Sequence, residues 1–108
     1  MQPSNRSNDV IMYPLIIWED RRLSNPARVI YMLLCDYAPI GEVAVFSPTE
    51  IQDTLQLSKY RYQKHMKILE DCGYIIPVPE QCDKKLQKVA YRLSETISIP
   101  EEYRSKDE

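Results

Sequence analysis

The chain has 108 residues, 44% of them apolar and 28% charged, and a net charge of −2, which is typical of one soluble globular domain. The longest apolar run, residues 10–18, is too short to cross a bilayer, and the polar residues 1–9 do not resemble a signal peptide. We therefore expect a cytoplasmic protein with no membrane partner. The irregularly spaced cysteines, the single histidine and the two glycines form no metal, catalytic or phosphate-loop pattern, so neither an enzyme nor a metal or cofactor site is predicted.

The charge is distributed unevenly. Residues 1–57 have four basic and seven acidic side chains (−3), residues 58–93 have eight and four (+4), and residues 94–108 have two and five (−3). Between Ser58 and Lys67, four cations, two tyrosines and the only histidine occur without an acidic residue. Such a local positive field suits a polyanion, although a solvated helix face would have the same pattern.

In chain order, residues 1–9 are predicted to be a disordered tail. The segment 10–18, VIMYPLIIW, is predicted to be extended, because its proline does not fit inside a helix. Its apolar side chains must pack on the core or on a second subunit, and Trp18 is interpreted as a core or dimer anchor. The acids that follow, Glu19 and Asp20, are interpreted as solvated charges.

The first helix is predicted within residues 21–41, where Ser24 or Asn25 can be the cap and Pro26 suits the first turn. Its buried stripe is predicted from helical spacing to be Ala27, Ile30, Tyr31, Leu34 and Tyr37 or Ala38. A short strand is predicted at residues 42–46.

The second helix is predicted from Pro48 to about Leu55, because Ser47 and Glu50 are spaced as a capping box. Ser58 is a further N-cap only three residues after that helix ends. Two helices joined by so short a turn must cross at a large angle, which is the helix-turn-helix arrangement.

The third helix is predicted at residues 59–72, with Gly73 as the left-handed residue that ends it. Its buried face, at i, i+4 and i+7, is predicted to be Tyr62, Met66 and Leu69. His65 is interpreted as a half-buried side chain. Residues 74–78 and 86–93 are predicted to form a hairpin with lysines near its tip, and the acidic residues 94–108 a tail or linker.

This order predicts an α+β fold over residues 10–93, a winged helix-turn-helix with three helices, a short strand and a C-terminal two-stranded β-hairpin wing. In such a domain the third helix enters the major groove of double-stranded DNA. Its residues Lys59, Tyr60, Arg61 and Gln63 are expected to touch base edges, while Lys64, Lys67 and the wing lysines can neutralise phosphates. The residues predicted to bind DNA are Ser58, Lys59, Tyr60, Arg61, Gln63, Lys64, Lys67, Lys84, Lys85 and Lys88. An alternative interpretation is that the wing lysines keep an exposed hairpin soluble.

Two segments, WEDRRLSNPARVIYMLLCDYA and SPTEIQDTLQLSKYRYQKHMKILEDCGYI, resemble the winged-helix domain at the N-terminus of DnaD-like and RepA-type replication initiators and of related phage or plasmid DNA-binding proteins of Gram-positive bacteria. The resemblance covers roughly residues 13–93. It implies that the third helix binds DNA with help from the wing, and that the domain forms a homodimer. It also implies a role in replication initiation or transcription regulation, with other replication or regulatory proteins as further partners. Gln56 stands where the family often has glycine.

A second hypothesis is a winged helix that serves protein–protein assembly and does not read DNA. The acidity of the chain, Tyr60, the apolar Ile68 and the acidic residues after 93 favour it. The salt dependence of binding separates the two hypotheses, because phosphate contacts weaken steeply with salt and an apolar interface does not.

Overall fold

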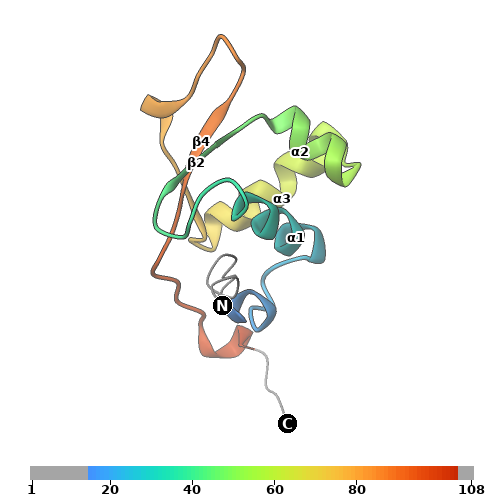
Figure 1. Cartoon of the computed structure of the whole chain (residues 1–108). Coiled ribbons are helices and arrows are strands. Elements are labelled where there is room, and N and C mark those ends of the chain that lie inside the picture. The colour runs from blue at the N-terminus through green and yellow to red at the C-terminus, as the bar shows by residue number, and fades with distance from the viewer. Residues whose placement is uncertain (1–14, 105–108) are drawn as a thin grey trace, which may run out of the picture.

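The computed structural model describes residues 15–104 as an α+β fold with three α-helices and a three-stranded antiparallel sheet (Figure 1). In chain order, with η for a 3-10 helix, the elements are η2 (Leu15–Trp18), α1 (Asn25–Leu34), β2 (Val43–Phe46), α2 (Pro48–Leu55), α3 (Lys59–Asp71), β3 (Ile75–Pro77), η3 (Pro79–Gln81), β4 (Val89–Leu93) and η4 (Glu101–Tyr103). Over this range no helix has the length and apolarity needed to cross a membrane. The tail predicted at residues 1–9 lies outside the described residues.

A serine caps each of the three α-helices, as predicted. The side chains of Ser24, Ser47 and Ser58 each accept a hydrogen bond from the backbone N–H three residues later. The capping box at α2 differs from the prediction, because the Glu50 carboxylate accepts a hydrogen bond from the Tyr37 hydroxyl, at 3.4 Å, instead of from the cap N–H.

The core lies between α1, α3 and the inner face of the sheet. The buried stripe of α1 is the predicted one, Ala27, Ile30, Tyr31 and Leu34, and Ala38 rather than Tyr37 continues it. Two aromatic pairs contribute to the packing. Tyr31 of α1 meets Tyr74, the residue before β3, edge-on with ring centroids 5.4 Å apart. Within the sheet, Phe46 of β2 stacks on Tyr91 of the neighbouring β4 at 5.9 Å.

The central strand of the sheet is β4, which pairs with β3 on one side and with β2 on the other. The β3–β4 pair is the predicted hairpin, but both strands are shorter than the predicted ranges 74–78 and 86–93. The intervening residues form η3 and a turn closed by the pairing of Asp83 with Lys88. The pairing of β2 with β4 was not predicted, because strand patterns give no pairing partner across 40 residues.

The N-terminal segment differs from the prediction. Residues 15–18 form η2 rather than an extended segment, and residues 10–14 of that prediction lie outside the described residues. Ile17 is fully buried, whereas Trp18 is 51% exposed, so the interpretation of Trp18 as a core residue is wrong. A run that is apolar throughout does not indicate which of its side chains face inward. The Trp18 ring is instead accompanied by the Arg28 guanidinium, 5.6 Å from the ring centroid.

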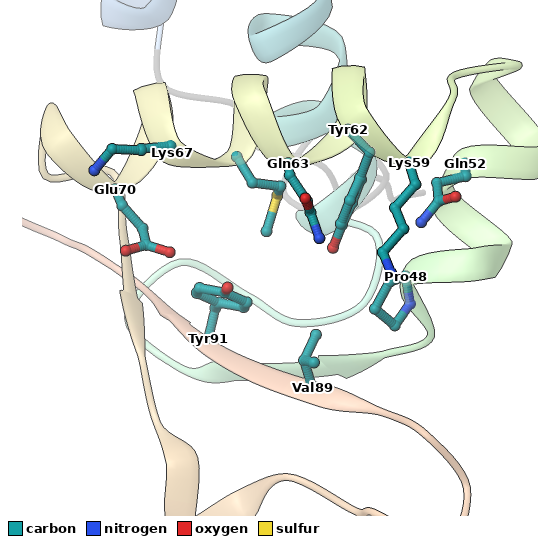
Figure 2. Close-up of a pocket in the computed structure, with 10 residues that line it drawn as sticks. Pro48, Gln52, Lys59, Tyr62, Gln63, Lys67, Glu70, Val89 and Tyr91 are labelled. Atoms are coloured by element: carbon teal, nitrogen blue, oxygen red, sulfur yellow. The ribbon is translucent and has the colours of Figure 1, made fainter.

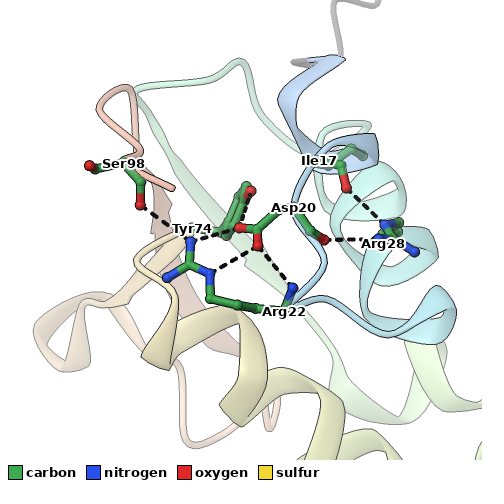
Figure 3. A network of polar contacts seen from close by, with 6 residues as sticks. All are labelled: Ile17, Asp20, Arg22, Arg28, Tyr74 and Ser98. Atoms are coloured by element: carbon green, nitrogen blue, oxygen red, sulfur yellow. Dashed lines mark hydrogen bonds and ion pairs between the residues drawn. The ribbon is translucent and has the colours of Figure 1, made fainter. Parts of the chain in front are cut away.

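Asp20 is fully buried, so its interpretation as a solvated charge is wrong. Arg22 donates three hydrogen bonds to this carboxylate, from its backbone N (3.0 Å), Nε (2.9 Å) and Nη2 (2.7 Å), and the Tyr74 hydroxyl donates another at 2.9 Å (Figure 3). Burial alone raises the pKa of Asp20, but these hydrogen bonds outweigh burial, and the pKa is lowered. The donors replace water around the carboxylate, which explains why a charge can be buried here.

The described part of the acidic C-terminal segment packs beside Asp20. Arg22 Nη2 donates to the Ser98 carbonyl at 3.3 Å (Figure 3), and the backbone N–H of Arg21 donates to the Tyr103 carbonyl at 2.9 Å. Ile99 is buried in the same region. The segments on either side of the three-helix core are therefore joined to each other at one end of the molecule (Figure 1).

Candidate nucleic-acid interface

The turn between α2 and α3 is a tight one. Gln56 adopts the left-handed conformation (φ 56°, ψ 48°), and the N–H of Leu57 donates to the Gln52 carbonyl at 2.9 Å. A positive φ is free of steric cost for glycine but costs a residue with a side chain about 1 kcal/mol. Ser58 then caps α3 by accepting a hydrogen bond from the N–H of Arg61 at 3.2 Å.

The inward face of α3 consists, as predicted, of Tyr62, Met66 and Leu69. His65 is also buried, at 6% exposure, and not half-buried as predicted, because α1 covers this side of the helix. Its Nδ1 lies 2.8 Å from Oγ of Ser24, the cap of α1. Burial lowers the pKa of His65, and the neighbouring cations Lys64 and Arg61 lower it further.

The outer surface of α3, which faces away from the core, consists of Tyr60, Lys64, Lys67 and Asp71. Tyr60 is 73% exposed, as predicted for a tyrosine outside the core. Lys67 and Asp71 form an exposed ion pair of 3.5 Å, one turn apart. The N-terminal half of this surface therefore presents an aromatic ring and an ammonium group to solvent.

The other predicted α3 residues lie on its two flanks. Arg61 is on the α1 side, one turn before His65, whose pKa it affects. Lys59 and Gln63 are on the opposite flank, where their side chains extend from α3 towards β4 (Figure 2). The seven residues predicted on this helix thus do not form one contact face.

A groove of about 420 Å³ lies between α3, the start of α2 and β4 (Figure 2). Its lining is Pro48, Gln52, Lys59, Tyr62, Gln63, Met66, Lys67, Glu70, Val89 and Tyr91. Burial raises the pKa of Tyr91 to about 12, and the Glu70 carboxylate next to the hydroxyl adds to this shift. The groove residues Gln52 and Tyr91 were not predicted as site residues. Gln52 is brought close to α3 by the tight α2–α3 turn, and Tyr91 by the pairing of β4 with β2, and local sequence patterns reveal neither.

The charged residues of α3 are placed unfavourably with respect to the helix dipole. The first turn has no acid and the last turn has no base, while Lys59 and Arg61 lie near the N-terminus and Glu70 and Asp71 near the C-terminus. A helix is stabilised by the reverse arrangement. The cations are therefore not placed where they would stabilise the helix.

Lys84 and Lys85 are exposed in the turn between β3 and β4, and Lys88, the residue before β4, is partly buried. Figure 1 shows this hairpin loop projecting from the sheet, at the end of the molecule away from η2 and η4. The three predicted wing lysines therefore lie together on one projection, separate from the α3 residues.

The basic side chains differ in whether other groups of the protein accept hydrogen bonds from them. Of the six arginines within residues 15–104, five donate side-chain hydrogen bonds to carbonyl or carboxylate groups of the chain: Arg21, Arg22, Arg28, Arg92 and Arg104. The sixth, Arg61 on α3, has no such partner in that range. Of the six lysines there, Lys67 alone forms an ion pair.

Comparison with models of protein families, with curated proteins and with solved structures gives no match for this chain. Within residues 15–104, no three His, Cys, Asp or Glu side chains are grouped so that they would hold a metal ion. The geometry and charge of α3 and of the β3–β4 hairpin are therefore the basis for a functional proposal.

Proposed function

We propose that this protein binds double-stranded DNA as a winged helix, with α3 in the major groove and the β3–β4 hairpin as the wing. Three helices with a three-stranded antiparallel sheet are compatible with that fold. The observation that carries the proposal is the pairing difference among the basic side chains. Within residues 15–104, Arg61 and the lysines of α3 and of the hairpin turn, apart from Lys67, form no ion pair. The other five arginines, including Arg92 of β4, donate side-chain hydrogen bonds to carbonyl or carboxylate groups of the chain.

In this mechanism DNA phosphates become the anionic partners of the basic side chains that form no ion pair within residues 15–104. Arg61 and the hairpin lysines contact the backbone, while Tyr60 and Lys64, in the first two turns of the outer surface, face the base edges. Because α2 has two acids, Glu50 and Asp53, and no cation, the cationic phosphate contacts come from α3 and the hairpin.

The biological role that fits this activity is replication initiation or transcription regulation in a phage- or plasmid-type element, as the sequence resemblance implies. A homodimer would place two α3 helices on half-sites about one DNA turn apart, roughly 34 Å. The half-site spacing of a selected binding site tests this arrangement.

An apolar hollow supports the second candidate, a protein–protein assembly module. It has a volume of about 280 Å³ and is lined by Asn25, Pro26, Val29, Leu55 and Leu57. Val29 is exposed there although it lies on the central helix α1. An exposed apolar surface of this kind is suited to a protein partner.

Fluorescence anisotropy with a labelled duplex, at about 50 and about 200 mM salt, separates the two candidates. We expect tight binding at low salt that weakens by orders of magnitude at high salt. Replacing both Arg61→Ala and Lys64→Ala should weaken binding by about 10- to 100-fold and reduce the salt slope by about one, because only Arg61 contacts a phosphate. The unfolding free energy should stay within about 0.5 kcal/mol of wild type.

The matched control replaces Arg21→Gln and Arg104→Gln, which removes the same net charge at the opposite end of the molecule. This variant should retain most of the DNA affinity. An absence of DNA binding by the folded wild-type protein at low salt would reject the proposal and favour the assembly module.

A further inference from the structure

The groove between α3 and β4 is a feature that the general mechanism leaves without a role. Its floor is apolar and aromatic and consists of Tyr62, Met66, Val89 and Tyr91. Its rim at the α2 end carries donors, the ammonium of Lys59 and the amides of Gln52 and Gln63 (Figure 2). An apolar floor below a cationic and amide rim matches a ligand with C–H surfaces and anionic oxygens.

Within residues 15–104, the Lys59 ammonium forms no ion pair that would neutralise it. The other end of the groove is different, because Glu70 lies beside Tyr91 and Lys67 is paired with Asp71. An anion would therefore be attracted to the Lys59 end and repelled at the Glu70 end. The two ends of the groove therefore differ, and the end next to the α2–α3 turn is the one suited to an anion.

We propose that this groove holds one sugar–phosphate strand of the DNA duplex, with a phosphate at Lys59, Gln52 and Gln63 and a deoxyribose over Val89 and Tyr91. This inference rests on the proposed DNA-binding function. The groove is partly open to solvent, so it would not enclose a small ligand, whereas a strand that continues beyond the groove would not need to be enclosed. Lysine and glutamine are ordinary phosphate-contacting residues in protein–DNA complexes.

This placement divides the α3 residues by task. This division differs from the prediction made from the sequence, in which Lys59, Arg61 and Gln63 touch base edges and Lys64 neutralises a phosphate. Lys59 and Gln63 contact the backbone on one flank of α3. Arg61 contacts the backbone on the opposite flank, next to α1. Reading of base edges is left to Tyr60 and Lys64 on the outer surface, since they lie between the two flanks.

The test compares the full chain with Lys59→Gln and Gln52→Glu, by anisotropy on several duplexes of different sequence and across salt concentrations. Lys59→Gln should weaken binding about tenfold on every duplex and reduce the salt slope by about one, because one phosphate contact is lost. Gln52→Glu, which adds a carboxylate to the rim, should weaken binding on every duplex by a similar factor. Tyr60→Ala, the matched outer-surface variant, should change the ranking of duplexes and leave the salt slope unchanged.

Circular dichroism melting of each variant confirms that it is folded. If wild type binds DNA with a steep salt slope but Lys59→Gln and Gln52→Glu bind like wild type, the groove assignment is wrong and the DNA-binding function stands. If Lys59→Gln changes the ranking of duplexes instead of the slope, Lys59 reads bases and the assignment is also wrong. If wild type does not bind duplex DNA, or binds a single strand of equal length more tightly, the proposed function itself fails.

Discussion

Two regions of this molecule use basic side chains in opposite ways. At the end formed by η2, η4 and the residues next to them, Arg22 is bound to the buried Asp20 and Arg104 to Glu19. In the first turn of α3, Arg61 and Lys59 have neither an acidic partner nor a carbonyl acceptor for their side chains within residues 15–104. The first set of charges holds chain segments together, whereas the second set is available to a ligand.

This difference shows why net charge is a poor guide to the function of the protein. The acids that make the chain negative include Asp20 and Glu19, which are neutralised locally by arginines. Interactions between exposed charges farther apart than about 10 Å are largely screened at 0.1 M salt. The acidic end therefore does little to cancel the field of α3, and an overall acidic chain can present a cationic helix.

The largest expected effect is at the Asp20 end. Asp20→Ala should lower the free energy of unfolding by about 2–4 kcal/mol, because it leaves Arg22 and the Tyr74 hydroxyl without their shared acceptor. Glu19→Ala, which breaks only the exposed pair with Arg104, should cost less than about 1 kcal/mol. Urea denaturation followed by circular dichroism measures both. Equal losses of unfolding free energy in the two variants would show that the buried network stabilises the fold no more than the exposed ion pair does.

The same network predicts the dependence of stability on pH. Because the pKa of Asp20 in the folded protein lies below its usual value of 3.8, its ionised form stabilises the fold. This contribution is fully present above the unfolded pKa and is lost as the pH falls through the folded pKa. Urea denaturation between about pH 3 and 6 should therefore show wild type converging on Asp20→Asn below about pH 4. The lowered pKa of His65 reduces the stability of both proteins below about pH 6.5. This contribution cancels when the stability of Asp20→Asn is subtracted from that of wild type. A constant difference down to pH 3 would contradict this assignment.

A smaller effect is expected at the turn before α3. Gln56→Gly should raise the free energy of unfolding by about 0.5–1 kcal/mol, because glycine adopts the observed positive φ at no steric cost. Gly73→Ala, at the other end of α3, should lower it by about 1 kcal/mol, and through backbone strain alone, because a Cβ there would meet no atom within 4 Å. Thermal or urea unfolding checks both changes. A loss of stability in Gln56→Gly would mean that the glutamine side chain makes a contribution that offsets the strain.

Local signals in the sequence predicted the helical part of the fold well. Ser24, Ser47 and Ser58 each cap the helix that they were predicted to start, and Gly73 has the positive φ expected at the end of α3. These features depend on a few neighbouring residues, so a single sequence contains the information needed to find them. The exposed side chains of α3 could be predicted in the same way, because helical spacing separates them from the buried stripe.

The tertiary structure alone decided which charges are buried and which surfaces meet. Asp20 is enclosed by Arg22 and by Tyr74, which is 54 residues away in the chain, and His65 meets Ser24 across 41 residues. The groove beside Lys59 exists because β4 pairs with β2 and lies beneath α3. Spacing along a single element predicts which side chains face away from the core, but the partners of those side chains come from elements distant in sequence. The sequence by itself therefore determined the caps, the helices and the cationic surface of α3, while three-dimensional packing decided which charges the protein pairs and which it leaves for a ligand.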